Sequence, residues 1–165
     1  MPPPPKDSAV IAVVDDDPDF AEIMTVVLGF EGFTPVSLPS ARAALDYFRH
    51  QLPSLAIIDY RLPDLLGVQL VETMRSDPQT RDLPVVLTTA LDRRYIGPLE
   101  EAARRLDAVL LLKPSLLDTL AGTIRVLLGG GAVDCKFRPS EATSSPVDSD
   151  CRFERWENRH PNTDL

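Results

Sequence analysis

Five short apolar runs recur along this chain, and a segment with helical periodicity follows each of them. Strands that alternate with helices form parallel sheets, because a parallel connection needs a crossover. Nearly continuous apolar strands are typical of sheets that are covered on both faces. Right-handed crossovers leave few topologies, and the flavodoxin-like order 2-1-3-4-5 is common for five strands. We therefore predict a flavodoxin-like, doubly wound α/β fold with flanking helices and with strands at 9–14, 33–38, 54–58, 84–89 and 108–112.

The expected helices carry start signals of the usual kinds. Asp17 is a good N-cap that precedes a first-turn proline, Pro18, and Ser40 is a plausible N-cap for the second helix. Gly67 precedes the third helical pattern, and Pro98 suits the first position of the fourth. These signals support the alternation of strands and helices.

The predicted domain covers residues 8–128. Residues 129–165 begin with three glycines and then mix Pro, Ser, Asp and Arg without periodicity, so we expect a glycine linker and a mostly disordered tail. The proline-rich residues 1–7 are also expected to be disordered. About 35 residues follow the last expected helix, too few for a typical output domain, which favours a stand-alone domain.

The charge, the apolar runs and the cysteines of the chain restrict its possible partners and its cellular compartment. The chain carries 17 basic and 25 acidic residues, a net charge of −8. A net acidic domain argues against direct nucleic-acid binding, because neutralised phosphates supply most non-specific affinity. No apolar run approaches the ~20 residues that span a bilayer, and the N-terminus lacks the hydrophobic segment of a signal peptide. Cys135 and Cys151 lie outside the predicted domain, which indicates a reduced, cytoplasmic setting. From the absence of a long apolar run we expect no membrane contact.

Polar residues occupy the positions where the expected strands end. In strand order they are Asp15 with Asp16, Asp59, Thr89 and Lys113. Ligands of an open parallel sheet bind beyond the carboxyl ends of its strands, and the order 2-1-3-4-5 has its switch point between strands 1 and 3. The pattern brings three carboxylates, a hydroxyl and an ammonium to one edge. It predicts a site for a divalent cation and a phosphoryl group.

Each of these residues also has an ordinary structural explanation. Asp59 could be a turn residue, Thr89 a β-branched strand residue and Lys113 a solvated strand end. Capping accounts for Asp17 but not for the two preceding carboxylates, which repel each other unless a cation neutralises them. Mg²⁺ takes one or two carboxylates together with phosphate oxygens. Beside such an ion, an aspartate can accept a phosphoryl group by in-line attack.

Over roughly residues 8–128 the chain resembles the receiver domain of two-component response regulators. The resemblance rests on four motifs in order, which are Val13-Val14-Asp15-Asp16, Asp59-Tyr60-Arg61-Leu62-Pro63 with Gly67, Thr89-Ala90, and Lys113-Pro114. It implies a phosphoprotein of phosphorelay signal transduction. A histidine kinase or a histidine phosphotransfer protein would supply the phosphoryl group, and an unknown downstream protein would receive the signal.

The resemblance also implies roles for individual residues. Asp59 becomes the phosphoacceptor. Asp16 and Asp59 would bind Mg²⁺ directly, the Arg61 backbone carbonyl would be a further ligand, and Asp15 would act through water.

Thr89 and Lys113 resemble the switch hydroxyl and the lysine of the family. The Lys113-Pro114 bond is cis in the family, which an X-Pro bond permits at modest cost. Receivers usually carry Tyr or Phe three residues before the lysine, where this chain has Leu110. This departure puts the aromatic part of the switch in doubt.

Three functions remain open at this stage. The first is a single-domain response regulator that is phosphorylated on Asp59 and has no separate catalytic domain, although it would dephosphorylate itself. The second is a receiver-fold interaction module that binds partners regardless of phosphate, which Leu110 favours. The third is a Mg²⁺-dependent phosphohydrolase of the haloacid dehalogenase type, for which Asp15-Asp16-Asp17 formally supplies the Asp-x-Asp arrangement.

Overall fold

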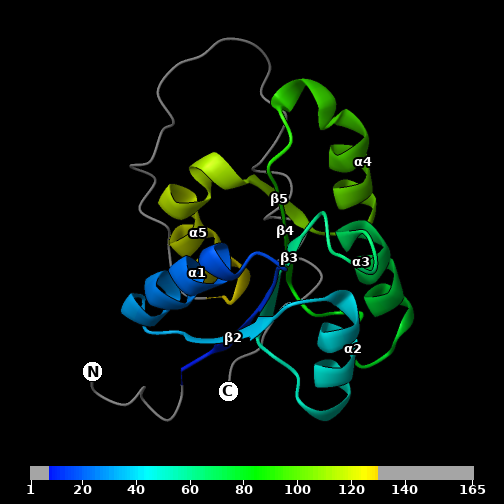
Figure 1. Ribbon diagram of the computed structural model, residues 1–165. Coiled ribbons are helices and arrows are strands. Elements are labelled where there is room, and N and C mark those ends of the chain that lie inside the picture. Colours follow the sequence, from blue (N-terminus) through cyan, green and yellow to red (C-terminus); the bar gives the residue numbers. More distant parts are fainter. Residues whose placement is uncertain (1–7, 130–165) are drawn as a thin grey trace.

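One five-stranded parallel sheet in the order β2-β1-β3-β4-β5 forms the centre of the computed structural model, which describes residues 8–129 (Figure 1). This order confirms the predicted flavodoxin-like fold. The expectations for residues 1–7 and 130–165 lie outside the described residues. The strands are β1 (Val10–Val14), β2 (Thr34–Leu38), β3 (Leu55–Asp59), β4 (Val85–Thr89) and β5 (Val109–Leu112).

Helices cover both faces of the sheet (Figure 1). One face carries α1 (Pro18–Phe30) and α5 (Lys113–Leu127), and the other carries α2 (Ala41–His50), α3 (Gly67–Ser76) and α4 (Gly97–Arg105). A short 3₁₀ helix, Arg93–Tyr95, precedes α4. Within residues 8–129, none of the helices is long and apolar enough to cross a membrane.

Two hydrophobic clusters lie on opposite sides of the sheet, and β1 contributes to both. Ile11 and Val13 pack with Met24 of α1 and Ile124 of α5, whereas the alternate residues of the strand pack toward α2 and α3. Successive side chains of a strand point to opposite faces, so a sheet covered on both sides buries every residue of a central strand. This explains why the strands read as continuous apolar runs.

The sheet covers only one strip of α1 and of α5. Ile23 and Leu117 share the helical spacing of the covered residues, but they are 47% and 46% exposed. The strips that touch the sheet are centred on Met24 and Ile124, both fully buried. Residues on the flanks of such strips keep the 3.6-residue spacing although nothing covers them.

Arg75, near the end of α3, joins three segments on the side of the sheet opposite to α1. Its guanidinium donates to the carbonyl oxygens of Leu106, Arg81 and Leu83, each at 2.8 Å, and to that of Asp107 at 3.3 Å. The α3–β4 connection and the α4–β5 turn are thereby tied to one side chain. Asp107 has a φ of 56°, so this turn adopts the left-handed conformation that side chains disfavour.

Arg75→Ala should therefore lower the free energy of unfolding by about 3 kcal/mol, because several carbonyl groups lose their donor together. Arg75→Lys should recover only part of this loss, since one ammonium cannot reproduce a planar fork of donors. Urea unfolding measures both variants, with Arg49→Ala on an exposed part of α2 as the control that should change little. A lysine variant as stable as the wild type would contradict this role of the guanidinium.

Candidate metal and phosphoryl site

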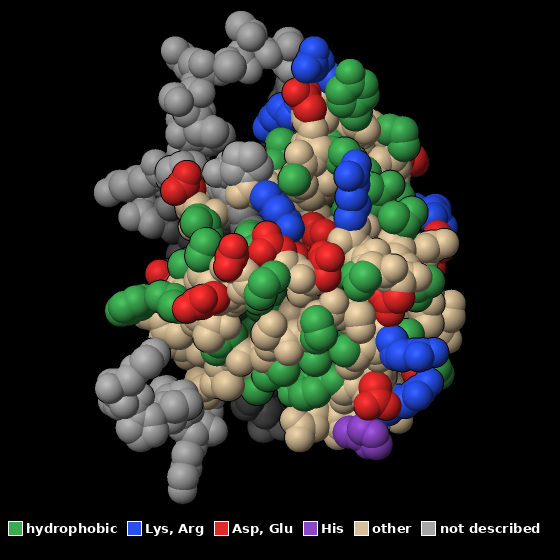
Figure 2. Space-filling view, viewed as in Figure 1, with side chains coloured by type: hydrophobic (Ala, Val, Ile, Leu, Met, Phe, Trp, Pro, Cys, Tyr) green, Lys and Arg blue, Asp and Glu red, His purple; other side chains and the backbone are tan. Residues whose placement is uncertain are grey.

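The carboxylates predicted at the strand ends meet at the edge shared by β1 and β3. The strands are parallel neighbours with Val14 opposite Ile58, so the next residue of each, Asp15 and Asp59, lies at the same level of the sheet. One carboxylate oxygen from each of Asp15, Asp16 and Asp59 lies within 4.8 Å of the others. Figure 2 shows acidic side chains gathered at the centre of this face of the molecule.

The three carboxylates differ in exposure. Asp15 and Asp59 are 3% and 7% exposed, whereas Asp16 is exposed to solvent. The buried pair can hold a cation from inside while Asp16 closes the site from the solvent side. Converging oxygen ligands of this kind suit a hard divalent cation, so the residues present fit Mg²⁺.

Asp17, the last of the three consecutive aspartates, has the separate structural role that was predicted for it. Its side chain accepts hydrogen bonds from the backbone N–H groups of Asp19 at 3.0 Å and Phe20 at 3.4 Å, which caps the N-terminus of α1. Its own N–H donates to Asp15 Oδ1 at 3.0 Å. The cap thus helps to orient a carboxylate of the cation site.

Lys113 connects the two buried carboxylates. Its Nζ lies 2.7 Å from Asp15 Oδ2 and 3.1 Å from Asp59 Oδ1. The same ammonium sits over the ring of Phe20, 4.3 Å from the centroid. A cation over an aromatic face is stabilised by the ring quadrupole, more strongly where water is excluded. Lys113 is therefore directed at the position where a phosphoryl group on Asp59 would carry negative charge.

Burial and neighbouring charges shift the pKa values of this pair. Burial raises the pKa of Asp59 above its usual 3.8, an effect that the hydrogen bond and charge of Lys113 only partly offset and that the charge of Asp15 reinforces. Burial alone would lower the pKa of Lys113, but its hydrogen bonds to Asp15 and Asp59 and their charges outweigh burial and raise it. One ammonium faces three carboxylates, so the site retains negative charge that a divalent cation would neutralise.

Thr89 ends β4, the strand next to β3, and is 2% exposed. Its Oγ1 accepts a hydrogen bond from the N–H of Leu91 at 3.1 Å, which leaves the hydroxyl proton able to donate to an oxygen above the strand end. The preceding Thr88 directs its hydroxyl to the Ile58 carbonyl at 3.5 Å. Thr88 is thus fully buried within the sheet and directs its hydroxyl at the backbone of the neighbouring strand.

The loop after Asp59 makes two backbone hydrogen bonds near this residue. The Arg61 N–H donates to Asp59 Oδ2 at 3.1 Å, and the Gly67 N–H donates to the Tyr60 carbonyl at 2.8 Å. A Cβ built on Gly67 would lie 2.3 Å from the backbone oxygen of Asp59. Only glycine fits at this position, because the start of α3 packs directly against the backbone of Asp59.

Lys113 directly follows β5, as predicted, and is the first residue of α5. The carboxyl end of the strand and the start of the helix thus place its side chain at the same edge of the sheet as the carboxylates. The cis form of the Lys113-Pro114 bond, which the resemblance implies, stays a prediction.

Leu110 occupies β5 opposite Leu87 of β4 and is partly buried against the cluster on the α2–α4 side. It therefore fills its position as an aliphatic core residue. The contact between Phe20 and Lys113 was not predicted from the sequence. The available signal was an aromatic residue in the first turn of the helix that follows the acidic pair.

The fold and the site together define a doubly wound α/β protein whose switch point carries an acidic cluster that could hold a cation beside a half-buried lysine. The sequence matches the response regulator receiver domain family over residues 11–124, and the chain belongs to this family. The receiver fold, its Asp59-containing acidic site and its place in two-component signalling are thus consistent with one another.

Similar proteins agree with this assignment. The chain is 34% identical over 119 residues to the response regulator Rre1 of Synechocystis, a match that covers 72% of this chain and 51% of that protein. It is 38% identical over 80 residues to the DNA-binding response regulator MtrA of Mycolicibacterium smegmatis, covering 48% of this chain and 34% of MtrA. The chain therefore spans between about a third and a half of these relatives. A solved sensor protein from Polaromonas is 30% identical, with a TM-score of 0.67 over 76% of this chain and 98% of that one.

Proposed function

We propose that this chain is a single-domain response regulator that accepts a phosphoryl group on Asp59 in a Mg²⁺-dependent reaction. The donor is the phosphohistidine of a histidine kinase or a histidine phosphotransfer protein. The output is contact with a downstream protein or transfer along a phosphorelay, in the cytoplasm and without direct binding of nucleic acid or membrane. The observation that carries the proposal is the buried Asp59 carboxylate, 3.1 Å from Lys113 and within 4.8 Å of Asp15 and Asp16 oxygens.

The reaction exchanges one bond to phosphorus for another. An oxygen of Asp59 attacks in line, the P–O bond forms as the P–N bond breaks, and the leaving imidazole takes up a proton. Asp16, Asp59 and the Arg61 carbonyl are the proposed direct ligands of Mg²⁺, with Asp15 acting through water. When bound, the ion would neutralise charge on the transferring group.

Protein donors stabilise the phosphoryl group on the other side. Lys113 already lies beside Asp59 Oδ1, so its ammonium can pair with a phosphoryl oxygen after a small movement. The Thr89 hydroxyl proton can be donated to a second oxygen, which would draw the end of β4 toward the acceptor. Hydrolysis of the acyl phosphate by water would return the protein to its starting state.

The proposal is tested by incubating the full chain with acetyl phosphate and Mg²⁺ and measuring intact mass. We expect a gain of one phosphoryl group that EDTA prevents. Borohydride reduction of the acyl phosphate followed by peptide mapping should place the modification on Asp59. An adduct that forms equally well in EDTA, or that maps to another residue, would contradict the proposal.

Leu110 supports a second candidate, an interaction module that works without phosphate. The position that carries a mobile aromatic ring in the family holds a leucine packed against the core here. No adduct despite demonstrated Mg²⁺ binding and slow hydrolysis would favour this function. The match to receivers gives no support to a phosphohydrolase of the haloacid dehalogenase type.

A further inference from the structure

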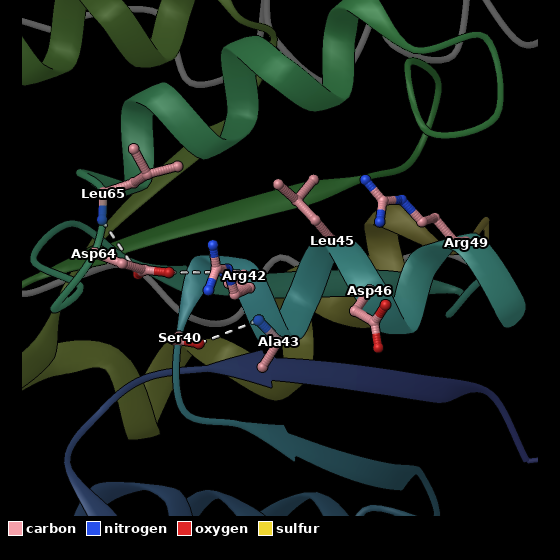
Figure 3. Close-up of a pocket in the computed structure, with 8 residues that line it drawn as sticks. All are labelled: Ser40, Arg42, Ala43, Leu45, Asp46, Arg49, Asp64 and Leu65. Carbon is pink, nitrogen blue, oxygen red and sulfur yellow. Dashed lines mark hydrogen bonds between the residues drawn. The ribbon is translucent and has the colours of Figure 1, made fainter.

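Asp64 joins the loop after the acceptor to a different element of the fold. Its carboxylate accepts hydrogen bonds from the first two N–H groups of α2, that of Ala41 to Oδ1 at 3.0 Å and that of Arg42 to Oδ2 at 2.8 Å. Figure 3 shows Asp64 directed from the β3–α3 loop toward the start of α2, across one end of a groove. More than twenty residues of sequence separate the partners, so the contact is tertiary.

The start of α2 also has a cap of its own. Ser40 Oγ accepts a hydrogen bond from the N–H of Ala43 at 3.1 Å (Figure 3). The first three N–H groups of the helix, which have no partner inside the helix, are thus divided between a local cap and Asp64. A carboxylate at this end is also favoured by the helix dipole.

The loop that carries Asp64 is held at its base by the site. The Arg61 N–H bonds to Asp59 Oδ2, Arg61 pairs with Leu66 in an isolated bridge, and the Gly67 N–H bonds to the Tyr60 carbonyl. Between these points the Asp64 side chain also accepts from the N–H of Leu65 at 3.2 Å. The loop is therefore fixed at two places, the acceptor strand and the N-terminus of α2.

We propose that Asp64 is a positioning residue that holds the β3–α3 loop in the conformation in which the Arg61 main chain faces the cation site, and that it thereby couples cation binding to the start of α2. This inference rests on the proposed function, since it assumes that the site binds Mg²⁺. Groups that orient metal ligands contribute to affinity without touching the metal. Coupling is reciprocal, so Mg²⁺ must also change the stability of the contacts made by Asp64.

The test compares Asp64→Ala with Ser40→Ala in the full chain. Both remove a cap from the same helix, but only the first releases the loop. We expect Asp64→Ala to weaken Mg²⁺ binding about tenfold in an NMR titration, with partial recovery in Asp64→Asn. Ser40→Ala should leave the Mg²⁺ affinity within about twofold of wild type while lowering the urea midpoint comparably. Equal Mg²⁺ affinity in Asp64→Ala and wild type would overturn the inference.

Amide hydrogen exchange gives an independent readout. Without Mg²⁺, the Arg61 amide should exchange faster in Asp64→Ala but not in Ser40→Ala. In the wild type, Mg²⁺ should slow exchange of the Ala41 and Arg42 amides, which donate to Asp64. It should slow exchange of the Ala43 amide, which donates to Ser40, to a smaller extent. Unchanged exchange at Arg61 in Asp64→Ala would also overturn the inference. A wild type that does not bind Mg²⁺ would instead refute the proposed function, and this inference with it.

Discussion

Asp59→Asn should abolish phosphorylation completely and at the same time make the protein slightly more stable. The amide nitrogen and oxygen of asparagine cannot form an acyl phosphate, and no other carboxylate of the site has the same position relative to Lys113 and Thr89. Asp15 is the nearest competitor, but its Oδ2 is held 2.7 Å from Lys113 and its Oδ1 accepts the Asp17 N–H. We therefore expect no residual adduct with acetyl phosphate.

The gain in stability follows from the raised pKa of Asp59. Burial is the main cause, so the folded protein binds the Asp59 proton more tightly than the unfolded chain does. The carboxyl group therefore favours folding below the unfolded pKa of about 3.8, and this contribution is lost as the pH rises through the folded pKa. At neutral pH without metal, Asp59→Asn should raise the free energy of unfolding by about 1 kcal/mol.

Urea unfolding in EDTA at several pH values measures this difference. The advantage of Asp59→Asn should shrink as the pH falls through the raised pKa of Asp59 in the folded protein, and it should be gone below about 3.8, where the carboxyl is protonated in the unfolded chain as well. Asp82→Asn, at an exposed position, is the matched control and should change neither phosphorylation nor stability noticeably. A less stable Asp59→Asn protein at neutral pH would mean that the ion pair with Lys113 outweighs burial. Phosphorylation of the Asp59→Asn protein would show that Asp59 is not the phosphoacceptor.

Gly67→Ala should strongly destabilise the protein, although it adds only one methyl group to the start of α3. The new Cβ would come within 2.3 Å of the Asp59 carbonyl oxygen and 3.1 Å of Tyr60 Cα, and both are backbone atoms that cannot rotate away. Relief requires α3 to move off the end of β3, which strains the hydrogen bond from Gly67 N–H to the Tyr60 carbonyl. We expect a loss of roughly 3 kcal/mol in the free energy of unfolding.

The same movement should impair the chemistry. Displacing the backbone of Asp59 misaligns its carboxylate with Lys113, and misplacement of about 1 Å can cost on the order of a hundredfold in rate. Gly122→Ala is the matched control, because Gly122 lies inside α5 and a Cβ there meets no atom within 4 Å. That variant should gain about 0.5–1 kcal/mol from helix propensity and keep the wild-type rate.

Urea unfolding and the rate of phosphorylation by acetyl phosphate measure both glycine variants. A Gly67→Ala protein as stable and as reactive as the wild type would show that α3 can shift without disturbing Asp59. If Gly67→Ala lowers the stability but leaves the phosphorylation rate unchanged, the packing of α3 against the end of β3 does not determine the geometry of the Asp59 carboxylate.

Periodicity and strand-end residues were sufficient to predict the fold and the position of the site. Continuous apolar strands and right-handed crossovers, which are general rules, leave few topologies, and the order 2-1-3-4-5 is the common one for five strands. Asp15 and Asp59 could be placed together because parallel neighbouring strands end at one edge of a sheet. Asp17 could be separated from Asp15 because proline follows it directly.

The chain by itself thus determined which residues lie at the switch point, since strand alternation and end position are encoded over a few neighbouring residues. Only the tertiary structure decided how those residues are held. The contact of Phe20 with Lys113 and the hydrogen bonds from α2 to Asp64 join segments far apart in sequence, and the approach of Gly67 to the Asp59 carbonyl depends on how α3 packs on the end of β3. No local pattern encodes such contacts, because they depend on how the helices are seated on the finished sheet.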